Sequence, residues 1–287
     1  MLTLDFTTYD VFTQRPFSGN PLAIVEGADD LSTAQMQTIA REFNLSETIF
    51  VQTADNTANT AKVRIFFPTA EIPFAGHPTI GCALHLAKKR GLDHVVLEEV
   101  AGLVPVTITN ATAQFTAPIV PFDCNITVDP ELAASALGLT TTQIGPHTAG
   151  VHEGGPRFLY MPVVNEAALQ QARPLQPAWD QLMQACKVDS AYLYTPSFNA
   201  RMFSPTAGIP EDPATGSASA ILASQLLQNG ALDNDGTTKL QLTQGVSMGR
   251  PSEIYFEAVV ASGVLSAVRI AGSAVPISQG QITVPST

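Results

Sequence analysis

The sequence is short of charged and especially of basic residues, and this excludes several classes of partner. Only 14% of its 287 residues are charged, and 25 acidic residues against 14 basic ones give a formal net charge of −11. An acidic chain of this kind is not expected to bind nucleic acid or an anionic membrane surface. A small anionic substrate stays possible, because a local helix terminus can outweigh a distant surface field. The 45% share of hydrophobic residues predicts a well-buried globular protein without disordered segments.

Cysteine is also scarce. The three that occur, Cys82, Cys124 and Cys186, are odd in number and lack the spacing of a metal site. No nucleotide-binding motif is present either, so we expect neither a metal nor another cofactor. No run approaches the roughly 18 apolar residues of a membrane span, and the first residues lack a basic segment followed by an apolar run. We therefore expect a reduced cytoplasmic protein with no membrane partner.

One loop sequence occurs twice in the chain. The first copy, Pro68–Ala83, has the sequence PTAEIPFAGHPTIGCA, and the second, Pro205–Ala218, has the sequence PTAGIPEDPATGSA. Their common start, P-T-A-x-I-P, recurs after 137 residues, and the match then resumes as H-P-x-x-G-x-A against D-P-x-x-G-x-A. This alignment predicts four matching pairs: His77 with Asp212, Pro78 with Pro213, Gly81 with Gly216, and Cys82 with Ser217.

A repeat with this long a period predicts two similar lobes rather than a solenoid. We expect an N-terminal lobe over residues 1–120, with the segment 272–287 as a candidate for its completion, and a C-terminal lobe over residues 121–271. Pro118 and Pro121 punctuate the expected linker. Each lobe has the length of an ordinary domain, and each is expected to contribute its loop to one active site in the cleft between them.

Both copies of the loop predict the same local structure, in which a strand is followed by a proline-containing loop and a helix. The helix begins at or just after His77 or Asp212 and ends near Gly91 or Gly230, since proline suits a first helical turn and glycine a left-handed cap. The free N–H groups and the dipole at such a helix start favour an anion. Further helices are predicted near residues 31–43, 129–138 and 177–187.

Each candidate residue also has a plain structural interpretation. A single histidine such as His77 is more often a capping or loop residue, and Asp212 is a good helix cap. Ser217 suits close packing after Gly216, although a hydroxyl at a helix start can also hold a carboxylate. Glu47, between a helix and a strand, is typical of a solvated turn. A hydrolase triad of Ser217, His77 and Asp212 is disfavoured, because the serine and the aspartate stand five residues apart and no G-x-S-x-G motif occurs.

Five segments of the sequence resemble the successive motifs of the PhzF-like (phenazine biosynthesis) isomerases. They are DVFTQRPFSGNPLAIV (10–25), FNLSETIFV (43–51), FAGHPTIGCALHL (74–86), EDPATGSASA (211–220) and QGVSMGRPSEI (244–254). The resemblance covers nearly the whole chain and implies an α+β fold of the diaminopimelate-epimerase type. Its two pseudo-symmetric lobes would each wrap a mixed β-sheet around a central helix, as the internal repeat also requires.

The resemblance implies a cofactor-independent isomerase that shifts a proton on trans-2,3-dihydro-3-hydroxyanthranilate or a related small carboxylate. Glu47 would be the general base, and His77 and Asp212 would orient the substrate and relay protons. Ser217 and the backbone N–H groups around Gly76 and Gly216 would bind the carboxylate, and Asn20 is a further candidate for substrate binding. Homodimers are common among proteins of this resemblance, so we expect a homodimer.

Two other functions stay open. A ligand-binding or protein-interaction module of the same fold would keep the cleft without turnover. An amino-acid racemase is weaker, because the cofactor-free racemases of this fold use two opposed cysteines at the helix starts. The resemblance places those positions at Ala75 and Pro213, neither of which can move a proton.

Overall fold

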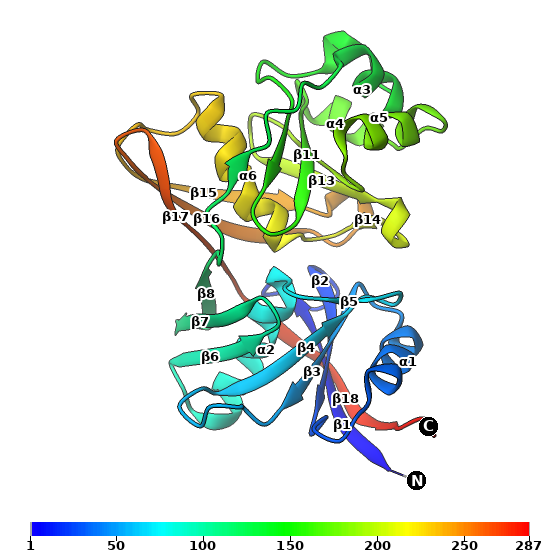
Figure 1. Cartoon of the computed structure of the whole chain (residues 1–287), viewed down its shortest axis with the longest axis vertical. Helices are drawn as coiled ribbons and strands as arrows, with labels where there is room; N and C mark the ends of the chain where they lie inside the picture. The colour runs from blue at the N-terminus through cyan, green and yellow to red at the C-terminus, as the bar shows by residue number, and fades with distance from the viewer. Residues whose placement is uncertain (1, 287) are drawn as a thin grey trace. The chain divides into compact units, whose positions relative to one another are not determined.

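The computed structural model describes residues 2–286, which divide into two compact units (Figure 1). Unit 1 holds the chain up to Pro118 together with the segment from Ala271 onward, and unit 2 is the continuous stretch Ile119–Ile270. The chain therefore leaves unit 1, builds unit 2 and then returns to unit 1.

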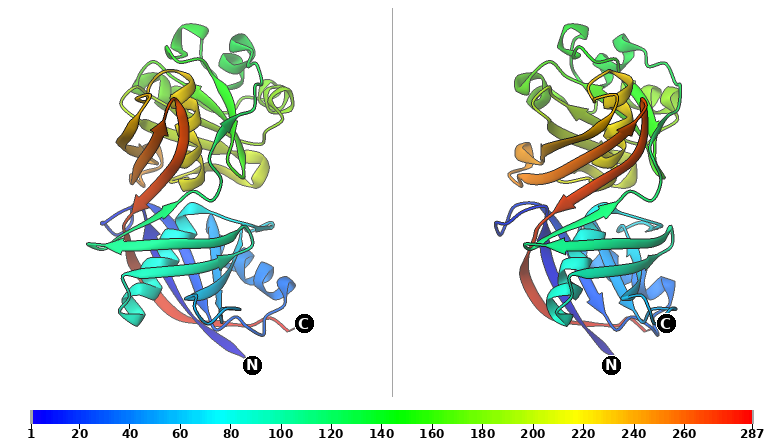
Figure 2. Two further views of the ribbon diagram at one scale, coloured as in Figure 1. Left: turned by 60° about the vertical axis from the view of Figure 1, so that its left-hand side comes forward. Right: turned by 90° about the vertical axis from the view of Figure 1, so that its left-hand side faces the viewer.

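Unit 1 contains a mixed sheet, in the order β18-β1-β2-β3-β4-β6-β7-β8 with the short β5 beside β4. The pairs β2–β3 and β4–β6 are parallel, and the others are antiparallel. The returning β18 runs along β1, as Figure 2 shows in red and blue. The elements are β1 (Thr3–Val11), β2 (Asn20–Glu26), α1 (Thr33–Phe43), β3 (Glu47–Gln52), β4 (Ala61–Phe66), β5 (Glu71–Ile72), α2 (Gly76–Arg90), β6 (His94–Glu99), β7 (Gly102–Thr109), β8 (Thr112–Thr116) and β18 (Ala274–Thr283).

Unit 2 repeats this strand pattern. Its order is β9-β10-β11-β12-β13-β15-β16 with the short β14 beside β13, and β11–β12 and β13–β15 are its parallel pairs. Each strand from β2 to β7 thus has a counterpart from β11 to β16. The elements are β9 (Phe122–Asp123), α3 (Pro130–Ala136), β10 (Gly150–Glu153), β11 (Arg157–Pro162), α4 (Glu166–Gln171), α5 (Ala178–Cys186), β12 (Ala191–Tyr194), β13 (Asn199–Ser204), β14 (Ile209–Asp212), α6 (Gly216–Gln228), β15 (Gly236–Gln244), β16 (Ser252–Ala261) and β17 (Val264–Gly272), with short 3-10 turns at Thr141–Gln143, Pro205–Ala207 and Val246–Met248.

Each unit has a central helix that is buried along most of its length. Eleven of the 15 residues of α2 are buried, and α2 packs against β1, β2, β3, β6, β7, β8 and β18. Ten of the 13 residues of α6 are buried, against β9, β10, β11 and β16. The short residues of these helices let the sheets approach closely: a Cβ on Gly81 would stand 2.5 Å from a methyl of Leu22 and 2.9 Å from one of Val11. The α+β fold of mixed sheets around central helices is confirmed.

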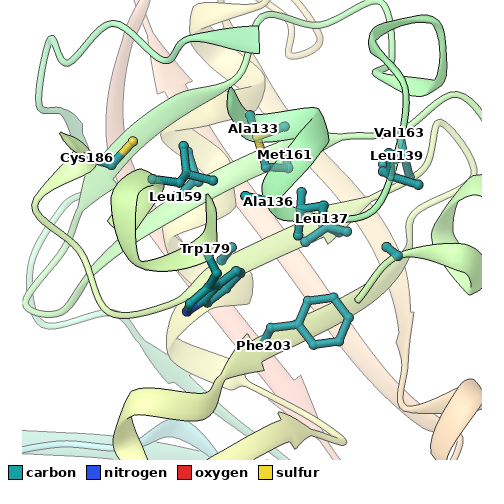
Figure 3. Packing of buried hydrophobic residues seen from close by; sticks show 14 of the residues in the cluster. Ala133, Ala136, Leu137, Leu139, Leu159, Met161, Val163, Trp179, Cys186 and Phe203 are labelled. Atoms are coloured by element: carbon teal, nitrogen blue, oxygen red, sulfur yellow. The ribbon is translucent and has the colours of Figure 1, made fainter. Parts of the chain in front are cut away.

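A second layer of helices covers the outer face of each sheet. In unit 2, α3, α4 and α5 enclose a core around Trp179 and Phe203, both nearly inaccessible to solvent (Figure 3). In unit 1, α1 does the same with Met36 and Ile39. The predicted helix near residues 31–43 begins at Thr33, and Ser32 and Gln35 form its capping box.

We predict that Gly81→Ala lowers the free energy of unfolding by about 1–3 kcal/mol, because its Cβ overpacks a filled core. Chemical denaturation would measure this loss. Combining the change with Leu22→Val should give less than the sum of the two single losses, since the smaller side chain makes room. Strictly additive losses would show that the two residues do not compete for space.

Candidate active site

Three candidates from separate motifs meet at one end of the unit 1 sheet. Asn20 and Glu47 are the first residues of the parallel strands β2 and β3, and His77 is the second residue of α2. His77 Nε2 lies 3.2 Å from Glu47 Oε2, and His77 Nδ1 lies 3.3 Å from Asn20 Nδ2. All three side chains are buried, with exposed fractions of 0%, 6% and 2% for Asn20, Glu47 and His77. The structure therefore gives Asn20, a further candidate from the sequence, a direct contact with His77.

Burial controls the charge of His77. It lowers the pKa of the imidazole from 6.5 to about 3, and the backbone of Pro21 partly opposes this shift. Proline has no N–H, so its backbone can act only as an acceptor for a ring N–H. The ring is therefore neutral at pH 7, with one nitrogen as a donor and the other as an acceptor. A proton can pass between a neutral imidazole and the carboxyl group beside it without changing the net charge of the pair.

The buried carboxyl group of Glu99 contacts the first turn of α2 through Thr79. Thr79 Oγ1 lies 2.8 Å from the carbonyl oxygen of Ala75, the helix N-cap, and 2.7 Å from Glu99 Oε1. The single proton of the Thr79 hydroxyl can be donated to either oxygen, and the bond to Glu99 favours the carboxylate form of that group. Glu99 is 7% exposed, and burial raises its pKa from 4.5 to about 8 although Thr79 lowers it. Glu99 is thus a neutral acid at pH 7.

Sequence reasoning missed Glu99, although a signal was present. Strand β6 alternates between exposed and buried positions, and Glu99 falls on the buried face with Val95 and Leu97. A carboxyl group on the apolar face of a strand is unusual enough to predict a special environment.

Asp212 ends β14 in unit 2 and is held by two polar partners. Its carboxylate accepts a 2.5 Å hydrogen bond from the hydroxyl of Thr215, and its backbone carbonyl accepts a 2.7 Å bond from the side-chain amide of Gln244. Gln244 also contacts Thr215 through both its amide oxygen and its nitrogen. Thr215 and Gln244 were not among the sequence candidates, although Gln244 opens the last of the five motif segments. Asp212 therefore comes with fixed geometry.

Ser217 and the two glycines stand at the helix starts. Gly76 and Gly216 are the first residues of α2 and α6, and Ser217 is the second residue of α6. Ser217 is half-buried. The helix ends agree with the predictions: Gly91 is the left-handed C-cap of α2, and Gly230, also left-handed, follows the C-cap of α6.

The pairing predicted from the two loops is wrong at the level of single residues. Counted from the helix starts, His77 corresponds to Ser217, and Asp212 corresponds to Ile72, since three residues separate strand from helix in both units. Thr79 and Ser219 confirm this register, because each hydroxyl bonds the carbonyl four residues earlier, at 2.8 and 2.9 Å. The similarity of H-P-x-x-G to D-P-x-x-G misled the alignment. The N-caps are Ala75 and Thr215, so both helix starts lack a thiol.

The remaining sequence interpretations concern cysteines, metals and membranes. Cys82 is fully buried, and burial raises the pKa of its thiol well above the ordinary value, as suits a small core residue. Between residues 2 and 286, no three His, Cys, Asp or Glu side chains gather closely enough to hold a metal ion. No helix in that same stretch combines the length and the hydrophobicity needed for a membrane crossing. The proposed hydrolase triad is not assembled within either unit, since His77 belongs to unit 1 and Asp212 and Ser217 to unit 2.

The family model PhzC-PhzF, described as phenazine biosynthesis-like protein, matches residues 9–280. The chain belongs to this family. A trans-2,3-dihydro-3-hydroxyanthranilate isomerase of Pseudomonas aeruginosa is 34% identical, over 96% of this chain and 98% of that protein. An uncharacterised isomerase of Mesorhizobium japonicum is 38% identical, over 98% of this chain and 99% of that protein. The crystal structure of a PhzF-family phenazine biosynthesis protein from Bacillus anthracis matches with a TM-score of 0.87 and 25% identity, over 99% and 100% of the two chains.

Membership of the PhzC-PhzF family makes the protein an isomerase. This confirms the reaction class that the five motif segments implied. A small-molecule substrate accords with that class.

Glu99 gives the folded protein a specific dependence on pH. Between pH 4.5 and about 8 the unfolded chain has lost this proton while the folded chain keeps it, so the group makes unfolding easier as pH rises. Its contribution to the slope is about −1.4 kcal/mol per pH unit. We predict that Glu99→Gln, which keeps the shape without the titration, removes this slope from denaturation curves measured between pH 5 and 8. The exposed Glu253→Gln is the control, and parallel curves for the wild type and Glu99→Gln would contradict the assignment.

Proposed function

We propose that this isomerase moves a proton on a small, conjugated carboxylate of the trans-2,3-dihydro-3-hydroxyanthranilate type. The single observation that carries the proposal is the buried contact between Glu47 and His77, 3.2 Å apart and supported by Asn20. The relative from Pseudomonas aeruginosa named for that substrate supports the choice of compound.

In the proposed reaction Glu47 is the general base. Its carboxylate takes a proton from an sp³ carbon of the substrate, the bonding electrons enter the conjugated system, and the same proton or one exchanged with solvent returns to another carbon. The substrate loses one C–H bond and gains another, so no oxidant or second substrate is needed. A base positioned in this way contributes about 10²–10⁴ in rate.

His77 helps to control where the proton resides. A proton on Nε2 faces Glu47 and favours the carboxylate, which is the form that abstracts a proton. A proton on Nδ1 leaves the Nε2 lone pair facing Glu47 and favours the carboxylic acid, which is the form that returns it. In this form the Asn20 amide must turn, so that its acceptor Oδ1 replaces the donor Nδ2 beside His77 Nδ1. Burial keeps His77 neutral in both forms. The two forms differ by the one proton that Glu47 takes from the substrate and later returns, so the negative charge passes between Glu47 and the substrate.

The carboxylate of the substrate is assigned to the helix starts. Backbone N–H groups at Gly76 and Gly216 and the hydroxyl of Ser217 are donors at the positive ends of long helices. Asp212, fixed by Thr215, is proposed to orient the substrate amine and to assist the proton relay. The assignments in unit 2 rest on the motif resemblance. The proposed reaction needs no metal and no cofactor.

The homodimer is proposed on the resemblance alone, and the cytoplasmic location on the cysteine usage and composition of the sequence. Sedimentation equilibrium would test the first, and a single species at the mass of one chain would overturn it. Fractionation of the source cells would test the second.

We predict that Glu47→Gln lowers the turnover number at least a hundredfold while the fold stays intact, because the amide cannot accept the proton. The purified protein would be incubated with trans-2,3-dihydro-3-hydroxyanthranilate in deuterium oxide and followed by proton NMR. Deuterium should enter the product of the wild type. The exposed Glu42→Gln on α1 is the matched control, and near-normal turnover by Glu47→Gln would remove Glu47 from its role.

The same experiment separates the alternative functions. An unchanged spectrum of the wild type would exclude this substrate, and other carboxylates would be screened by the same exchange. Tight binding of such a compound without any exchange would favour a binding module. Loss of optical rotation from one enantiopure amino acid would favour a racemase.

Ser217→Ala should act on binding rather than on chemistry. We predict an increase in KM of about tenfold to a hundredfold with a smaller change in kcat, since a hydrogen bond to a charged carboxylate is worth about 1.5–3 kcal/mol. Initial rates at varied substrate concentration would measure both constants. An unchanged KM would place the carboxylate elsewhere.

A further inference from the structure

A cavity lies within unit 2, and none of the residues assigned above lines it. Its volume is about 210 Å³. It opens at the carboxyl ends of the parallel strands β11 and β12, because Pro162 and Tyr194 are their last residues and both line it. Ligands of α/β sheets bind preferentially at this end of parallel strands. A cavity of about 150 Å³ already accommodates benzene, so this one has room for a ring with a short substituent.

The walls of the cavity are apolar and uncharged apart from a polar corner. Three prolines, a valine, an alanine and a phenylalanine form most of the lining, and no lysine, arginine, aspartate or glutamate is part of it: the lining residues are Pro146, His147, Pro162, Val163, Tyr194, Thr195, Pro196, Phe198 and Ala231. Phe198 has a φ of 61°, in the left-handed region that bulky residues rarely adopt. The turn between β12 and β13 therefore contributes an aromatic ring to the cavity at a position where glycine or asparagine would fit without strain.

A chain of hydrogen bonds ends at this corner, and the direction of each bond can be worked out. The side-chain nitrogen of Gln225 can only donate, and it contacts the carbonyl of Thr148 at 2.8 Å and the hydroxyl of Tyr194 at 3.0 Å. The amide oxygen of Gln225 can only accept, so the 2.7 Å contact with His152 Nε2 carries the proton of that nitrogen. Burial lowers the pKa of His152, so its Nδ1 accepts the 2.9 Å bond from Ser224.

The same reasoning fixes the tautomer of His147. Because the Tyr194 oxygen already accepts from Gln225, its own proton is free to donate to His147 Nδ1, 3.0 Å away. Nδ1 must then carry a lone pair, and burial lowers the pKa of this half-buried ring, so the single ring proton is on Nε2. Protonating Nδ1 as well would leave the Tyr194 hydroxyl proton without an acceptor. His147 thus offers one neutral N–H donor at the wall of an apolar cavity.

We propose that this cavity binds a small uncharged ring compound carrying one acceptor oxygen, with that oxygen on His147 Nε2. The prolines and Phe198 supply flat surfaces for the ring. The fixed N–H donor selects a carbonyl or ether oxygen. A carboxylate is disfavoured, since no cationic side chain lines the cavity and burying an unpaired charge is costly. The site is independent of the isomerase reaction.

Three probes of one shape test the proposal on the intact protein. Acetophenone has the ring and the acceptor oxygen, ethylbenzene lacks the oxygen, and benzoate adds a charge. Titrations followed by ¹H–¹⁵N NMR should give saturable shifts of Ala231, Phe198 and their neighbours with acetophenone. Ethylbenzene should bind about two- to tenfold more weakly, as the loss of one hydrogen bond implies, and benzoate more weakly than acetophenone. Equal affinity for ethylbenzene, tighter binding of benzoate, or shifts confined to other regions would overturn the proposal.

Two variants then test the donor and its tautomer. His147→Phe keeps an aromatic wall, and it should reduce the affinity for acetophenone to that for ethylbenzene without changing the latter. Tyr194→Phe removes the hydroxyl that keeps the ring proton of His147 on Nε2. The ¹⁵N shifts of His147 should then move away from those of an Nε2-protonated ring. Tyr255→Phe, at an exposed tyrosine of β16, is the control. A wild-type ring protonated on Nδ1 would contradict the assignment. The comparison of the three probes on the wild type tests the preference for an uncharged acceptor oxygen even where a variant does not fold.

Discussion

Burying the start of a helix is the constraint on which the rest of this structure depends. Both central helices lie inside their sheets, and their first residues, Gly76 and Gly216, are buried. The free N–H groups of a helix start normally bond water or a capping side chain, yet neither Ala75 nor Thr215 caps its helix through a side chain. In each unit the backbone N–H groups at the start of the central helix therefore donate no hydrogen bond to an N-cap side chain. An anionic substrate is the natural partner for such donors.

The same burial explains why the groups near these helix starts are neutral. A charge taken out of water is costly, so the imidazole of His77 loses its proton and the carboxyl of Glu99 keeps its own. The shifts have opposite directions and one physical cause, which is desolvation. His77 and Glu99 therefore add no charge of their own. In the proposed reaction the only charge that shifts is the one that passes between Glu47 and the substrate.

Features set by neighbouring residues were predictable from the sequence. The capping box of Ser32 and Gln35 and the start of α3 at Asp129 and Pro130 are local patterns, and the structure contains both. The strand β18 was not predicted, because Pro276 and Gly280 break the alternation of a strand. The ladder accommodates this proline with an irregular register opposite Thr8 and Tyr9.

Features that depend on distant contacts were out of reach. The two loops were aligned by their identical residues, whereas the structure aligns them by the backbone positions of strand, loop and helix. The bonds among His147, Tyr194 and Gln225 join residues between 31 and 47 positions apart, and no periodic pattern marks them. His77 was singled out by the duplicated loop and Glu47 by the resemblance, and no local pattern predicts that their side chains touch.

The corrected register also changes how the duplication is understood. Two units with one strand order have different side chains at the second residue of their central helices, His77 in one and Ser217 in the other. A histidine can hold and transfer a proton at neutral pH, whereas a serine can only donate or accept a hydrogen bond. The two helix starts therefore cannot be equivalent in the chemistry, even though they are equivalent in the fold. In the proposed reaction Glu47 and His77 of unit 1 transfer the proton, and Ser217 and the carboxylate of Asp212 in unit 2 hold polar groups of the substrate. A symmetric two-base reaction needs matching titratable groups at both helix starts, and this division of roles instead favours one base that removes and returns the proton.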